Sequence, residues 1–145
     1  MASLTSNQLC NICCIHYNAG LRCCALGSLV EGGYLFAKRG GIGWIVACAS
    51  TQVTRTWTAR GDAVTTAQAS NACGDWFVPS KSDLLVGFAC NSFWDSFTAS
   101  SYWANTLTSS YSTTGWYVMF GSGVVRYTLN KTTICPVRAF RRVSY

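Results

Sequence analysis

The chain has 145 residues, of which 50% are hydrophobic, so it is long enough for one hydrophobic core and too short for two stable domains. Only 11% of its residues are charged, against about 25% in a typical soluble domain, and 14% are aromatic. The net charge of +6 comes from few acids and scattered bases, which argues against a nucleic-acid-binding face of clustered Lys and Arg. We expect a single domain that works as a homo-oligomer or within a larger assembly, because a monomer of this composition would expose large apolar patches.

Cysteines are concentrated at the start of the chain. Residues 1–31 hold five of the nine, and their density falls after Glu31. We therefore divide the chain into an attachment segment, residues 1–31, and a folded domain, residues 32–145. The apolar pieces of the first segment are interrupted by His16 and Arg22, and no basic stretch precedes them. The sequence predicts neither a signal peptide nor insertion into a membrane.

An odd number of cysteines means that at least one is free, bound to metal or paired between chains. Cys10, Cys13, His16 and Cys23 are of the types that hold zinc tetrahedrally, although their spacing is not that of a standard zinc finger. Disulfides in an extracellular particle and buried free thiols are the other two interpretations. The three stay open, and no cofactor is expected.

Two strands and two helices are predicted in the first half of the domain. Residues 34–37 and 44–49 have the composition of strands, and the glycines between them permit a tight hairpin. Residues 65–68 have the form of a capping box, which predicts that a helix begins there. Residues 80–83 have a similar form and predict a second helix start.

Strands follow in the second half. Residues 116–120 suit a central strand, residues 121–123 a turn, and residues 124–129 alternate in hydrophobicity. Residues 135–142 are predicted to be one last strand, with Arg138 on one side and Arg141 on the other. A hairpin, two short helices and then several antiparallel strands predict an α+β fold.

Four blocks carry a resemblance to a known family. They are GGYLF at residues 32–36, ACGDWFVPSKSDL at 72–84, YWANT at 102–106 and VRAFR at 137–141. In this order they resemble the C-type-lectin-like domain at the C-termini of bacterial collagen-like adhesins and surface lipoproteins, and of phage tail and fibre proteins. Asp83 replaces the family's usual Glu, YWANT replaces YWSST, and residues 1–31 have no counterpart.

The resemblance implies a C-type-lectin-like fold over Gly33 to Arg142, with Trp76 and Trp103 in its core. It also implies a scaffold that displays variable loops, and fold alone does not name the ligand. The calcium-binding motifs of sugar-binding lectins are missing, and five acids leave little for a calcium site. No Ser/His/Asp set or paired carboxylates appear, and the only histidine is His16, so we do not expect an enzyme.

A display domain without a secretion signal suits a virus, whose proteins assemble in host cytosol. We therefore expect a phage virion structural protein on the virion surface, first a tail-fibre or tail-tip adhesin for host recognition. A capsid decoration or cement protein and a cellular surface adhesin are the alternatives. Residues 1–31 are expected to bind other virion proteins, and a trimer is favoured by analogy with fibres.

Recognition of a host-surface glycan or protein is expected in residues 91–114, where Ser, Thr, Asn, Trp and Tyr dominate as in other binding loops. Trp94, Asn105 and Tyr111 are the candidate ligand-binding residues, and Trp103 is their buried support. Rigid aromatic rings provide contact area at a small entropy cost, and Asn provides directional hydrogen bonds. A solvated loop and a subunit contact are the alternatives for this stretch.

Overall fold

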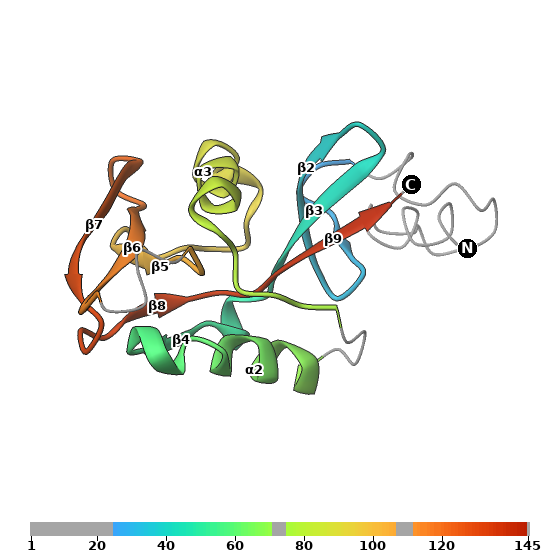
Figure 1. The fold of residues 1–145 in the computed structure, drawn as a ribbon. Coiled ribbons are helices and arrows are strands. Elements are labelled where there is room, and N and C mark those ends of the chain that lie inside the picture. Colours follow the sequence, from blue (N-terminus) through green and yellow to red (C-terminus); the bar gives the residue numbers. More distant parts are fainter. Residues whose placement is uncertain (1–24, 71–74, 107–111, 145) are drawn as a thin grey trace, which may run out of the picture.

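The structure is a computed structural model that describes residues 25–70, 75–106 and 112–144, here called the described residues. They form an α+β fold with three small antiparallel sheets and two α-helices (Figure 1). The strands are β1 Leu29–Val30, β2 Gly33–Arg39, β3 Ile42–Ala47, β4 Val53–Arg55, β5 Ser101–Trp103, β6 Thr114–Met119, β7 Val124–Asn130, β8 Cys135–Val137 and β9 Phe140–Ser144. The helices are η1 Ala49–Thr51, η2 Trp57–Ala59, α2 Asp62–Ser70, α3 Lys81–Ala89 and η3 Asn91–Phe93, where η marks a 3-10 helix.

The predicted hairpin is confirmed as β2 and β3, with Leu35 opposite Ile45. At its tip Gly40 and Gly41 have φ angles of 58° and 79°, in the left-handed region that glycine tolerates. β9 pairs with the other edge of β3, so the sheet order is β1-β2-β3-β9. Strands from both ends of the described chain thus share one sheet.

Residues 25–31, expected in the attachment segment, pack into this part of the domain. β1 pairs with β2, Val30 is buried in the core, and the carboxylate of Glu31 accepts a hydrogen bond from Arg141. A truncation that leaves the sheet intact must therefore keep the chain from Ala25 onward.

The capping box at the second helix is confirmed. The backbone N–H of Asp83 donates to the Ser80 hydroxyl at 3.2 Å, and the Asp83 carboxylate accepts from the backbone N–H of Ser80 at 3.1 Å. The capping box predicted at residues 65–68 is wrong, because α2 already begins at Asp62. The carbonyl of Gly61 accepts from the backbone N–H of Thr65 at 3.3 Å, a bond over four residues that is typical of an α-helix.

The last predicted strand is two strands. β8 pairs with β4, whereas β9 pairs with β3, so the chain passes from one sheet to another around residues 138–139. Arg138 and Arg141 are both buried, with 2% and 8% of their surface exposed. Each is held by carboxylates from other segments, Asp95 for Arg138 and Asp75 and Glu31 for Arg141.

A third sheet has the order β5-β6-β7. The predicted strand at residues 116–120 is confirmed as β6, and its pairing with β7 shifts register between Gly115 and Tyr117. Among the described residues β7 lies at the edge of this sheet, and most of its residues are exposed.

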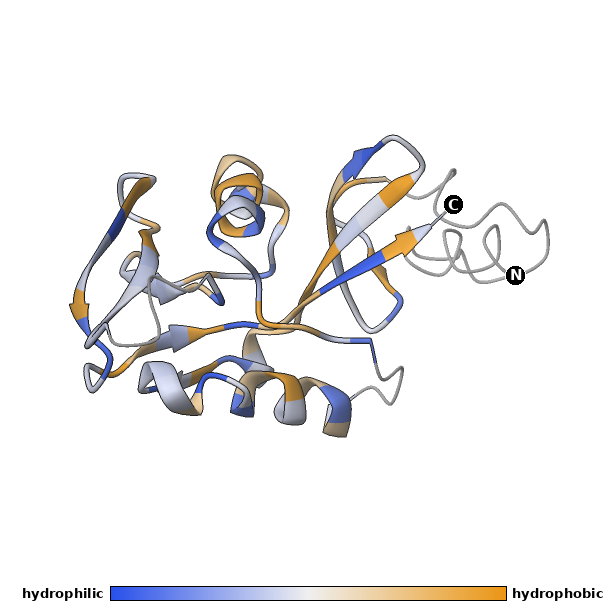
Figure 2. Cartoon of the chain, viewed as in Figure 1, coloured by the Kyte–Doolittle hydropathy of each residue, from blue (hydrophilic) through white to orange (hydrophobic). Residues whose placement is uncertain are grey.

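Helix α3 lies between the β2-β3 hairpin and the third sheet, and most of its ribbon has the hydrophobic colour in Figure 2, which fits that position. Trp76 and Trp103 are buried, as predicted, with 5% and no exposure. The indole N–H of Trp103 donates to the carbonyls of Arg55 at 3.0 Å and Thr133 at 3.2 Å. These bonds satisfy the polar atom of a ring that would otherwise be costly to bury.

Candidate ligand-binding surface

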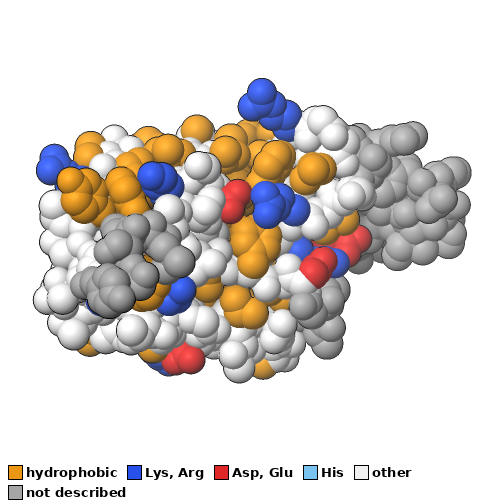
Figure 3. Space-filling view, in the orientation of Figure 1, with side chains coloured by type: hydrophobic (Ala, Val, Ile, Leu, Met, Phe, Trp, Pro, Cys, Tyr) orange, Lys and Arg blue, Asp and Glu red, His pale blue; other side chains and the backbone are white. Residues whose placement is uncertain are grey.

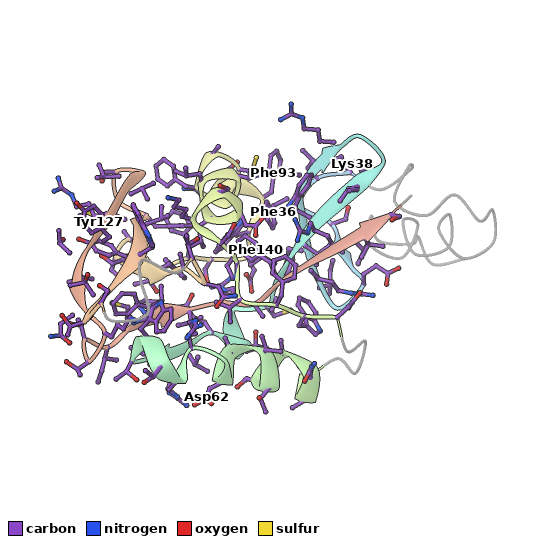
Figure 4. The ribbon with its side chains drawn as sticks, viewed as in Figure 1. Phe36, Lys38, Asp62, Phe93, Tyr127 and Phe140 are labelled. Atoms are coloured by element: carbon purple, nitrogen blue, oxygen red, sulfur yellow. The ribbon has the colours of Figure 1, made fainter. Side chains whose placement is uncertain are left out.

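Trp94, predicted to be exposed, lies in the core. Only 6% of its surface is exposed, and its ring packs against Phe36 and Phe140, which lie side by side in Figure 4. The turn of η3 places it inward, whereas Phe97 is 38% exposed. The prediction that Trp94 contacts a ligand is therefore corrected, since the ring has too little free surface.

A buried arginine holds the segment that follows Trp94. Arg138 donates to the Asp95 carboxylate at 3.0 Å and to the side-chain oxygen of Gln52 at 2.9 Å. Tyr102 donates its hydroxyl to the same Gln52 oxygen at 2.6 Å and accepts from the backbone N–H of Thr98 at 2.9 Å. The loop between η3 and β5 is thus tied to the core by polar contacts.

Asn105 is exposed, and its backbone N–H donates to the carbonyl of Pro79 at 2.8 Å. Its side-chain oxygen accepts a hydrogen bond from the Nε of Arg60, also at 2.8 Å. Tyr111 and the other residues of 107–111 lie outside the described residues. The structure therefore places Asn105 beside a cation that the sequence analysis had not connected with it.

Two cations lie over the ring of Trp57. The guanidinium carbon of Arg60 is 3.5 Å from the ring centre, and the ammonium of Lys131 is 4.3 Å from it. This group is not evident in the sequence, because Lys131 reaches Trp57 only through the fold. The three-residue spacing of Trp57 and Arg60 in a helical turn was the one local signal for a stacked pair.

A second cation–aromatic group lies near the first. The ammonium of Lys81, at the start of α3, is 3.7 Å from the ring centre of Trp116, which contacts the ring of Tyr127 at 4.9 Å. Tyr127 is 54% exposed on β7 (Figure 4). The backbone N–H of Lys81 also donates to the hydroxyl of Thr106, the neighbour of Asn105. Arg60 of the first group bonds to Asn105 and Lys81 of the second group bonds to Thr106, so the two groups adjoin at residues 105–106.

We call these residues together the basic aromatic surface. Its members are side chains brought together from five separate parts of the chain: Trp57, Arg60, Lys81, Asn105, Trp116, Tyr127 and Lys131. Figure 3 shows hydrophobic and basic side chains gathered at the end of the molecule formed by β6 and β7.

All the acidic side chains of the chain are paired, whereas several basic side chains of the described residues are not. Each of the chain's five acids forms an ion pair with an arginine, namely Glu31 and Asp75 with Arg141, Asp62 with Arg55, Asp83 with Arg142 and Asp95 with Arg138. Several bases contact no carboxylate of the described residues, and they are Arg39, Arg60, Lys81, Arg126 and Lys131. Three of these belong to the basic aromatic surface, which therefore carries uncompensated positive charge.

The described cysteines Cys48, Cys90 and Cys135 are free thiols. Burial raises the pKa of each, that of Cys135 to about 11, so they are neutral at physiological pH and poor nucleophiles. No group of three His, Cys, Asp or Glu side chains within the described ranges is placed to hold a metal ion. The predicted zinc alternative at Cys10, Cys13, His16 and Cys23 lies outside these ranges.

Comparison with known proteins finds no matching family model and no matching curated protein. Among the helices of the described residues, none is both long and apolar enough to span a membrane.

Proposed function

We propose that this protein is a phage virion component that binds the host surface through its basic aromatic surface. The observation that carries the proposal is the gathering of unpaired cations, exposed Tyr127 and exposed Asn105 at one end of the domain. Aromatic and amide side chains with adjacent positive charge are the groups that recognition surfaces use.

The arrangement of the domain supports display. The first strand of the described residues, β1, pairs with β2 at the opposite end of the molecule from β6 and β7 (Figure 1). Attachment to a particle through the preceding residues leaves the basic aromatic surface pointing outward. The α+β order of hairpin, helices and strands also agrees with the proposed C-type-lectin-like scaffold.

The test uses the purified full-length chain and the host on which the particle is propagated. Fluorescently labelled protein is expected to bind these cells, and excess unlabelled protein is expected to slow adsorption of the phage. The variant Tyr127→Ala removes the most exposed ring of the surface and should weaken both effects, while Ile134→Ala, also an exposed apolar side chain at 64%, serves as the matched control. Absence of cell binding by the unchanged protein refutes the proposal.

A capsid decoration protein is the second candidate, and edge strand β7 favours it. Val124 and Tyr127 are exposed along an edge that has no strand partner among the described residues. Such edges pair readily with other chains. Electron microscopy of intact particles separates the two: density for the chain repeated over the capsid lattice supports decoration, and density at the tail tip supports the adhesin.

A further inference from the structure

The ring of Trp57 contacts two cations and is itself held rigidly. Its backbone N–H donates to the carbonyl of Lys131 at 2.9 Å, and its indole N–H donates to the carbonyl of Ala104 at 3.0 Å. A side chain at Gly115 would meet the Trp57 ring at 2.7 Å, so the strand backbone lies directly against the indole. Only 7% of Trp57 is exposed, and the ring is therefore held in place before any ligand arrives.

The two cations at the Trp57 ring, Arg60 and Lys131, have unused hydrogen-bond donors. Arg60 donates its Nε to Asn105 and one NH1 proton to the carbonyl of Trp57 at 2.9 Å. A guanidinium has five N–H donors, so further protons of Arg60 remain free of partners among the described residues. The Lys131 ammonium contacts the ring and no carboxylate of these residues.

Burial without a counter-charge makes Arg60 a favourable place for an anion. Desolvation by burial lowers the pKa of its guanidinium, and no acidic side chain of the described residues forms an ion pair with it. The nearest acid in sequence, Asp62, is already paired with Arg55 at 2.9 Å. An anion at this position would gain an electrostatic interaction that the protein itself leaves unused.

We propose that Arg60 and Lys131, held over Trp57, bind the anionic groups of an acidic polysaccharide. This inference rests on the proposed function and names the class of its ligand. Arg60 presents a planar donor set that suits the two oxygens of a carboxylate or a phosphate, and Lys131 adds a second charge at the same ring. Asn105 fixes the guanidinium through the bond to its Nε.

The neighbouring group favours a sugar polymer over nucleic acid. Tyr127 and Trp116 offer aromatic surface on which the apolar face of a sugar ring can pack. A surface that binds nucleic acid neutralises phosphates with clustered Lys and Arg, whereas this surface has a few separate cations.

Calorimetric titration of the full-length chain with four probes tests the inference. The probes are polygalacturonate, which carries carboxylates, poly(glycerol phosphate), neutral dextran and a single-stranded oligonucleotide. We expect binding to one or both of the acidic polymers, weaker binding at higher salt, and none to dextran. The two acidic polymers distinguish carboxylate from phosphate as the recognised group.

Variants that keep the apolar stem and remove the charge locate the site. Arg60→Met with Lys131→Met should lower affinity for the acidic polymer about tenfold or more, since charge-assisted hydrogen bonds are lost. Lys131→Met alone removes no hydrogen bond between this side chain and the described residues, so it reports on the charge if the double variant is unstable. Arg39→Met, at the tip of the hairpin at the far end, removes an equally unpaired charge and should change nothing.

Several results would overturn the inference. They are equal losses in the Arg39→Met control, unchanged affinity in the Arg60 and Lys131 variants, preference for the oligonucleotide, and no binding to either acidic polymer. Cell binding by the same variants separates the two proposals. If the unchanged protein binds host cells and the double variant binds them equally well, the ligand class is wrong and the proposed function stands. If the unchanged protein does not bind cells, the proposed function itself fails.

Discussion

Replacing Asp95 with Asn tests whether the buried Arg138 depends on its carboxylate. Arg138 has 2% of its side chain exposed and forms its one ion pair of the described residues with Asp95, at 3.0 Å. The change keeps the shape of residue 95 and removes its charge. Arg138 would then rely on the Gln52 oxygen, which also accepts a hydrogen bond from Tyr102.

The expected cost follows from the burial of the two partners. Removing one member of a fully buried ion pair costs about 3 to 5 kcal/mol, because the other charge stays in a medium of low polarity. The Asp95 side chain is 22% exposed, so water partly compensates, and we expect Asp95→Asn to lower the free energy of unfolding by about 2 to 3 kcal/mol. Arg138→Met should cost less, because the carboxylate that it leaves behind can be hydrated.

A double-mutant cycle followed by urea denaturation measures the coupling. If the ion pair is the reason for the loss, the double variant should be less destabilised than the sum of the two single variants by about 1 to 2 kcal/mol. The denaturant slope of each variant must match that of the parent for the comparison to hold. Additive losses within about 0.5 kcal/mol would show that Arg138 and Asp95 act independently and would refute the reasoning.

Three further predictions concern the core, a helix cap and a thiol. Trp94→Ala should lower the free energy of unfolding by about 3 to 5 kcal/mol in chemical denaturation, as a buried ring does, and a loss below about 1 kcal/mol would contradict its buried position. Ser80→Ala removes half of the capping box of α3 and should cost about 1 kcal/mol, with Ser82→Ala on the exposed side of the same helix as a control that changes little. Burial raises the folded-state pKa of Cys135 from 9.0 to about 11, so stability present below pH 9 should fall by up to about 2 kcal/mol between pH 9 and 11. Denaturation of Cys135→Ala over this range should show a shallower fall than the parent, and parallel curves would show that the thiol is not involved.

Local features of the sequence predicted the elements that depend on neighbouring residues. The hairpin formed by β2 and β3 follows from apolar strand residues around glycines, and Gly40 and Gly41 have the required φ angles. The capping box of Ser80 and Asp83 is also local, since both hydrogen bonds join residues three apart. The start of α2 was missed because residues 65–68 match a capping box by composition, while the turn at Gly61 begins the helix earlier.

The candidate site was only partly predictable. Asn105 was expected at the surface and lies there, but its use as a binding residue stays a prediction. Trp94 was expected at the surface because it stands in a polar loop. It is buried because Phe36 and Phe140, from strands distant in sequence, form an apolar pocket around it. The three-residue spacing of Trp57 and Arg60 was the one local signal at this ring, and Lys131 carried none that would bring it there.

The sequence by itself determined the α+β order of elements, the hairpin, the cap of α3 and the burial of Trp76 and Trp103. These follow from backbone preferences and from hydrophobic transfer, both of which depend on residue type and short-range spacing. The tertiary structure alone decided which arginines form ion pairs with the five acids and which bases of the basic aromatic surface stay without a carboxylate among the described residues. Charge pairing depends on distances between groups far apart in the chain, and those distances are established only when the sheets and helices have packed.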